Sequence, residues 1–219
     1  MEQIKEDFQH VYNLSVESFN KKEYSAFFRN IRPGIEYLSQ FLIYDFFGNE
    51  EEAEDLINGD TSISKNREDN SYSISSYPAN FKPTGRVFCE LFPKAYFCKH
   101  RDVTSKYAAE EKKRIKRGLD SCSAEMCRYY SIASEMGSHA GRSSMDVEVQ
   151  ARSCAAFFMG FLDYISSNRI ASKSAIDFLG KFDKFVFGDV DNTSDYQNQI
   201  DNLIKEAEEK DAALLTAQK

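Results

Sequence analysis

The chain has 219 residues, of which 42% are hydrophobic and 29% are charged, and it carries a net charge of −7 with a pI near 5.1. This length suits one domain, or one domain with an appendage, and the apolar content excludes a wholly disordered chain. Because a uniformly acidic surface repels phosphates, the composition also argues against a protein that coats nucleic acid along its whole surface.

The compartment is predicted from the N-terminus, the apolar runs and the cysteines. The first seven residues include acids where a signal peptide needs basic and apolar residues. The longest apolar run, Cys154–Leu162, is about half of a membrane span. Five cysteines at irregular spacings favour reduced, buried thiols over a disulfide framework. Cys98 and His100 offer two metal ligands without a CxxC pair. We therefore expect a cytoplasmic protein with no membrane contact, no metal and no cofactor.

Helical periodicity is strong in the N-terminal part. Residues 4–19 and 22–48 each place apolar side chains at steps of three and four, which return to one face of a helix. Pro33-Gly34 predicts a kink or short break in the second helix. Gly48 should end it, and Glu50 to Ile57 predicts one more short helix.

The pattern disappears between Gly59 and Gly85, a stretch with six serines and two prolines. A polar segment of this length predicts a long functional or mobile loop. Residues 86–98 are rich in aromatic side chains. They are compatible with either a short strand or an irregular packed segment.

Helices are predicted again at residues 105–134, 146–166 and 172–187. A last helix, residues 194–219, has only a thin apolar seam and suits a coiled coil or a connector. The predicted fold is all-α: a bundle of four to five helices with a long polar insertion and a protruding C-terminal connector helix. The domain would span residues 1–190, with the insertion at 59–104, and the connector residues 191–219.

Common nucleotide-binding, hydrolase and metalloprotease motifs are absent from the sequence. His139 is the most distinctive histidine, because it lies in the small-residue run Gly137-Ser138-His139-Ala140-Gly141 between two predicted helices, with Arg142 following and Arg128 preceding. One interpretation is a helix–helix turn whose histidine binds a backbone carbonyl. The other is a polar site where an imidazole and guanidinium groups act on a phosphate.

The segment 134–142, followed by the helix to Ser166, resembles the signature of HEPN-fold domains. It is most similar to the HEPN-like domain near the N-termini of bacterial restriction and helicase proteins. The second helix, with Arg32 and Glu36 one turn apart, resembles an early helix of that family. The resemblance covers roughly residues 5–60 and 105–168.

This resemblance implies a helical bundle that dimerises through its motif helices. Active members are metal-independent ribonucleases in which an arginine precedes the histidine by a few residues. The histidine activates or orients the ribose 2′-hydroxyl, and the arginine neutralises charge on the phosphate. The expected arginine positions hold Ile132, Ala133 and Ser134 in this chain. Catalytic candidates are therefore His139 with Arg142 or Arg128, supported by Arg32, Glu36, Gly137 and Ser138.

A basic segment precedes this junction. Residues 99–117 contain eight lysines and arginines against three acids. A solvated helix face stabilised by pairs four residues apart would explain it. The alternative is a strip that contacts RNA or DNA, with Tyr107, Tyr129 and Tyr130 available to stack on bases. The nucleic-acid-binding candidates are Lys112, Lys113, Arg114, Lys116 and Arg117.

The leading hypothesis is a homodimeric HEPN-like regulatory module of a bacterial anti-phage defence or restriction-type protein. Its charged final helix suggests a C-terminal catalytic domain or a partner subunit. A metal-independent endoribonuclease of toxin type, binding RNA at the basic segment, is the alternative. A coiled-coil adaptor that uses residues 194–219 is a further one.

Overall fold

The computed structural model describes residues 1–66, 71–75, 83, 85–99, 106–136, 144–182, 184–187 and 205. These residues are mostly helical. The helices are α1 (Glu2–Asn20), α2 (Tyr24–Phe47), α3 (Glu50–Asn58), α4 (Arg86–Lys99), α5 (Lys106–Met136), α6 (Ser144–Ser167) and α7 (Lys173–Leu179). The strands β1 (Ser62–Lys65) and β2 (Tyr72–Ser75) form an antiparallel pair. The predicted all-α class is therefore confirmed at this coarse level.

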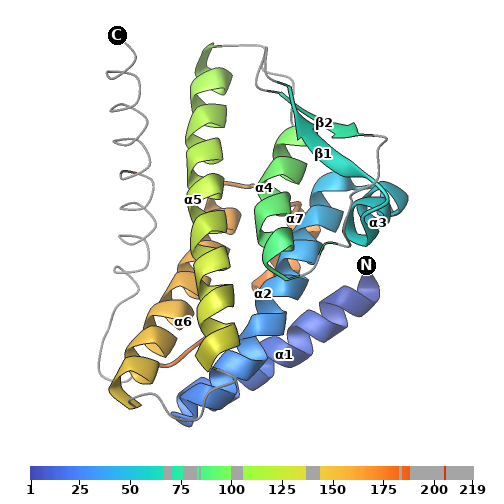
Figure 1. Cartoon of the computed structure of the whole chain (residues 1–219). Coiled ribbons are helices and arrows are strands. Elements are labelled where there is room, and N and C mark those ends of the chain that lie inside the picture. The colour runs from blue at the N-terminus through green and yellow to red at the C-terminus, as the bar shows by residue number, and fades with distance from the viewer. Residues whose placement is uncertain are drawn as a thin grey trace.

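α2 lies at the centre of the bundle, where it contacts α1, α4, α5 and α6 (Figure 1). Its apolar residues cover more than one face because several helices pack on it. Gly48, with φ of +61°, ends the helix in the left-handed conformation that glycine tolerates best. Of the kink or short break predicted at Pro33-Gly34, the break is wrong, because α2 continues through both residues. Gly34 lies beside Val11 of α1, where even a Cβ atom would be at an ordinary contact distance of 3.5 Å.

α4 is a core helix, although its sequence left its structure undecided. Phe88 and Phe92 are buried, and the helix packs between α2 and α5. Pro93 lies inside it and has no N–H to donate to the carbonyl of Cys89, four residues earlier. The hydroxyl of Ser123 on α5 donates to that carbonyl at 2.6 Å. Pro93 therefore leaves a carbonyl unpaired within α4, and α5 satisfies it with a hydrogen bond between the two helices. The predicted insertion, residues 59–104, thus contains one of the helices that build the core.

Two further corrections concern short elements. The polar stretch after Gly59 contains the β1–β2 hairpin, in which Ile63 pairs with Ile74. The predicted helix 172–187 is too long: α7 ends at Leu179, and residues 184–187 form no regular element. Phe185 in this C-terminal strap (residues 184–187) is buried against aromatic rings of α1 and α2, which a continuing helix would not allow. The predicted connector, residues 191–219, lies outside the described residues apart from Lys205.

Candidate functional site

The junction that the sequence singles out lies between α5 and α6, and its four candidate residues, Gly137, Ser138, His139 and Arg142, are outside the described residues. What the structure does describe is the end of α5 at Met136, the start of α6 at Ser144 and the helices around them. The remaining candidates, Arg128, Arg32, Glu36 and the basic residues of α5, can therefore be placed.

Arg128 is exposed on α5 and is engaged within its own helix. Its Nη1 lies 2.8 Å from Oε2 of Glu125, and its guanidinium carbon lies 4.9 Å from the centre of the Tyr129 ring. Partial burial acts to lower the pKa of Arg128, but the nearby Tyr129 and Glu125 outweigh it and hold the pKa above its ordinary value. Arg128 is thus a fully charged group that already has an anionic partner.

Arg32 contacts α5 on a different tyrosine. Its Nη2 donates to the hydroxyl of Tyr130 at 3.1 Å, and its guanidinium carbon lies 5.1 Å from the ring centre. A Cβ atom at Gly85, just before α4, would collide with the same Tyr130 hydroxyl. Tyr130 is therefore held between α2 and the start of α4. Glu36, one turn after Arg32, is half-buried and forms no ion pair with it.

The two neighbouring tyrosines of α5 face different helices. Tyr129 is buried and packs on Phe157 of α6, with ring centres 5.4 Å apart, whereas Tyr130 contacts α2. Burial raises the pKa of Tyr129 to about 12. Arg128 and Arg32 are consequently each stacked on a tyrosine of the same helix but are not in contact with each other. The structure brings no second described arginine to Arg128.

The basic residues of α5 lie on the broad face of the helix that is turned away from its buried residues. Arg114 donates to Asn168 at the end of α6 at 2.8 Å. Lys116 is paired with Asp120 and lies over the rings of Tyr72 and Phe97, on the side of the hairpin. Burial alone would lower the pKa of Lys116, but the hydrogen bond and charge of Asp120 raise it above its ordinary value.

The other three basic candidates lie on the same broad face of α5. Lys113 is exposed, whereas Lys112 and Arg117 are half-buried. A nucleic-acid contact on this helix would therefore use Lys113 and Arg114, whose side chains are both exposed, more readily than Lys116.

The five cysteines are free and buried, as predicted. Burial raises the pKa of Cys122 and of Cys154, which keeps both thiols protonated and unreactive. Among the described residues, no three side chains of histidine, cysteine, aspartate or glutamate gather as metal ligands would. In the same part of the chain, no helix combines the length and apolarity of a membrane span.

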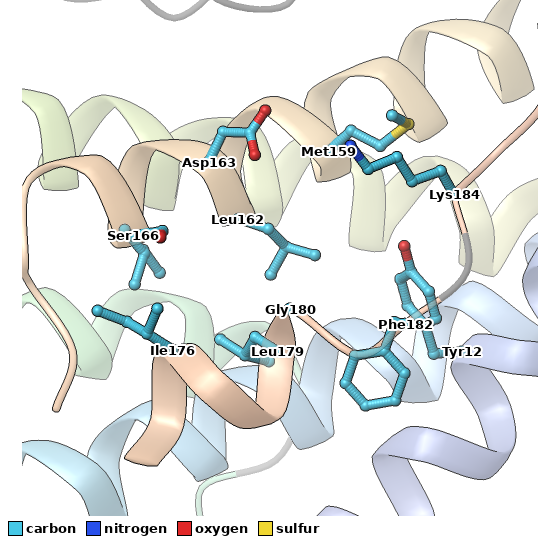
Figure 2. Close-up of a pocket in the computed structure, with 11 residues that line it drawn as sticks. Tyr12, Met159, Leu162, Asp163, Ser166, Ile176, Leu179, Gly180, Phe182 and Lys184 are labelled. Atoms are coloured by element: carbon cyan, nitrogen blue, oxygen red, sulfur yellow. The ribbon is translucent and has the colours of Figure 1, made fainter. Parts of the chain in front are cut away.

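A cavity lies between α6 and α7, and nothing in the sequence predicts it. It has a volume of about 150 Å³ and is bounded by α6, α7 and the chain that follows α7 (Figure 2). Asp163 and Lys184 are among its lining residues. Asp163 and Lys184 belong to no common sequence motif, so only the fold shows that they line one cavity.

Comparison of the chain with family models, with curated proteins and with solved structures gives no match.

Proposed function

We propose that this chain is a HEPN-like dimerisation and regulatory module of a bacterial anti-phage defence or restriction-type protein, and that it does not cleave RNA itself. Two long helices, α5 and α6, flank the junction whose residues resemble the family signature. A helical bundle of this kind is what the resemblance implies, which supports the proposal.

The state of Arg128 is the observation that carries the non-catalytic part of the proposal. A catalytic arginine must direct its charge at the phosphate in the transition state. Arg128 instead forms a 2.8 Å ion pair with Glu125 and stacks on Tyr129. Arg32 likewise donates to Tyr130. Each guanidinium would have to leave an existing partner before it could act on RNA.

Val149 supports the dimerisation part. This side chain is 54% exposed on α6, within two turns of the junction, where the resemblance places the contact between protomers. A valine at the edge of an interface would be covered on association, which recovers the hydrophobic free energy lost by its exposure. Val186 is exposed to a similar extent, at 64%, in the C-terminal strap and provides a matched control position.

Light scattering after size-exclusion chromatography tests the dimer. We expect the intact chain to be dimeric at tens of micromolar, and Val149→Glu to lower the dimer fraction because a buried unpaired carboxylate is costly. Val186→Glu should leave the dimer fraction unchanged. A monomeric wild-type chain at this concentration, or equal effects of the two substitutions, would refute the proposed interface.

An RNA-cleavage assay in EDTA tests the regulatory assignment. We expect no cleavage by the wild type beyond that of a His139→Ala variant. Cleavage that disappears in His139→Ala would replace the regulatory proposal with the ribonuclease one. Repeating the assay with Arg128→Ala would then show whether the Glu125-bound arginine takes part.

Nucleic-acid binding without cleavage is a second candidate, favoured by the exposure of Lys113 and Arg114 on the basic half of α5. Exposed cations that neutralise phosphates make binding weaken as salt rises. We expect Lys113→Gln to weaken binding of single-stranded RNA and to reduce its salt dependence, while Lys181→Gln, at an exposed position beyond α7, leaves both unchanged. Equal binding by the two variants would remove this candidate.

A further inference from the structure

The cavity beside α6 has an apolar interior. Its lining includes Leu162 of α6, Ile176 and Leu179 of α7, and Phe182 just beyond α7. Figure 2 shows Leu162 on the α6 side and Ile176 and Leu179 on the opposite side, so the space between the two helices is bounded mainly by hydrocarbon. Such a surface gains free energy when an apolar group displaces water from it.

The size of the cavity limits what can enter it. An apolar cavity of roughly 150 Å³ accommodates a benzene ring, and this cavity has a volume of about 150 Å³. Most drug-sized ligands need several hundred cubic ångströms. The apolar part of an occupant is therefore limited to one aromatic ring or a group of similar bulk, and any remaining atoms would lie at the opening.

Two opposite charges lie among the residues that line this opening. Asp163 comes from α6 and Lys184 from the C-terminal strap, and both side chains are exposed. Figure 2 shows them on the same side of the cavity as Met159, away from Ile176 and Leu179. Within the described ranges neither charge is paired with another side chain. An acid and a base are thus both available to a ligand at the opening.

The position of Lys184 is set by the residues that follow it. Phe185 is buried between Tyr12 and Phe27, with ring-centre distances of 5.5 and 5.8 Å. The next residue, Val186, donates its N–H to the side chain of Asn20 at 2.9 Å. These contacts hold the strap against α1. The backbone of Lys184 is consequently placed at the cavity before any ligand arrives, which lowers the entropy cost of binding.

We propose that this cavity binds a free aromatic α-amino acid of the size of phenylalanine. The ring occupies the apolar space, the carboxylate pairs with Lys184 and the ammonium pairs with Asp163. A ligand with only a carboxylate would be repelled by Asp163, and one with only an amine by Lys184. The zwitterion satisfies both charges together with the apolar interior. This site is separate from the α5–α6 junction and does not depend on the proposed function.

Isothermal titration calorimetry of the full chain tests the proposal with L-phenylalanine and three analogues. Phenethylamine lacks the carboxylate, 3-phenylpropanoate lacks the amine, and glycine lacks the ring. For a ligand of this size we expect a Kd of roughly 0.1–1 mM for L-phenylalanine. Each single-charge analogue should bind about three- to tenfold more weakly, because it loses one charged hydrogen bond and faces one like charge. Glycine should show no binding.

Two pairs of variants assign the charges. Lys184→Gln should weaken the binding of L-phenylalanine and of 3-phenylpropanoate by about three- to tenfold, without weakening the binding of phenethylamine. Asp163→Asn should instead weaken the binding of L-phenylalanine and of phenethylamine. The matched controls are Lys181→Gln and Asp177→Asn, two exposed charges in the same region that do not line the cavity. They should leave every affinity unchanged.

A cavity-filling variant tests where the ring binds. Leu162→Phe should abolish measurable L-phenylalanine binding while its circular dichroism spectrum stays helical. The proposal is overturned if L-phenylalanine shows no binding up to about 10 mM. It is also overturned if the charged analogues bind as well as L-phenylalanine, or if the control substitutions weaken binding as much as those at Lys184 and Asp163.

Discussion

The contact between α5 and α6 depends on a residue without a side chain. Gly118 of α5 lies against Tyr164 of α6, which is only 1% exposed. A Cβ atom at Gly118 would lie 2.6 Å from Cζ and 3.2 Å from Cε2 of Tyr164, and closer still to the hydroxyl. That hydroxyl donates to the carbonyl of Ile115 at 3.4 Å, and the ring is surrounded by core residues. The ring therefore has little space into which it can move.

Two effects of opposite sign decide the outcome of Gly118→Ala. Alanine is favoured over glycine inside a helix by about 1 kcal/mol. Against this, overpacking of a core costs about 1–3 kcal/mol, and displacing the Tyr164 hydroxyl from its carbonyl costs about 1 kcal/mol more. We expect the free energy of unfolding to fall by roughly 1–3 kcal/mol. At a size near 220 residues, a loss of about 2 kcal/mol lowers Tm by roughly 4–8 °C.

Urea unfolding followed by circular dichroism measures the change, with Gly34→Ala as the matched control. A Cβ atom at Gly34 of α2 would lie 3.5 Å from Cγ2 of Val11, an ordinary contact distance. That variant should therefore be as stable as the wild type or up to about 1 kcal/mol more stable. Should Gly118→Ala raise the midpoint in the same way, the close α5–α6 contact would be refuted.

Three further predictions test separate parts of the fold. Gly85→Ala should lower the free energy of unfolding by about 1–3 kcal/mol, because Gly85 has φ of +49° and its Cβ would collide with Tyr130; an unchanged urea midpoint would contradict this. Burial raises the pKa of Tyr44 and of Tyr129 to about 12. The contribution of these two neutral tyrosines to the free energy of unfolding should therefore be fully present below about pH 10. It should fall as the pH rises towards 12, by up to about 1.4 kcal/mol per pH unit for each tyrosine. Unfolding midpoints at pH 9, 10 and 11 measure this fall, and a midpoint that does not change over this range would refute it. Asp45→Ala should lower the free energy of local unfolding of α7 by about 1 kcal/mol, because Asp45 Oδ2 accepts the backbone N–H of Ser172, the residue before α7, at 2.8 Å. Faster hydrogen exchange confined to α7 would confirm it.

Periodicity predicted the long helices because each has a continuous apolar face. In α1, Phe8, Tyr12, Ser15 and Phe19 return at steps of three and four, and all four are buried in the structure. The bounds predicted for α1, α2, α5 and α6 agree with the observed ones to within a few residues. This agreement is expected where the same face of a helix packs along its whole length.

The failures have a common physical cause. Pro93 argues locally against a helix, and its cost is offset by the hydroxyl of Ser123, a residue of another helix. At α7, Gly180 is the residue that follows the helix, yet the spacing of Leu179, Phe182 and Val186 predicts a longer one. The rings of Phe182 and Phe185 instead pack on α1, where they lie 5.1 and 5.5 Å from Tyr12, ring centre to ring centre. In both cases a contact with a distant segment outweighed the local preference.

The same argument applies to the candidate site. Arg32 was singled out by its place in a helix that resembles a known family, but its partner Tyr130 is 98 residues away. The sequence alone presents Tyr130 only as a side chain that could stack on a base beside the basic segment. The Arg32–Tyr130 contact assigns both residues to the packing of α2 against α5, beside Gly85. A tyrosine that stacked on RNA would have to give up this contact. The basic half of α5 therefore offers charge to RNA without the aromatic partner that the sequence suggested at Tyr130.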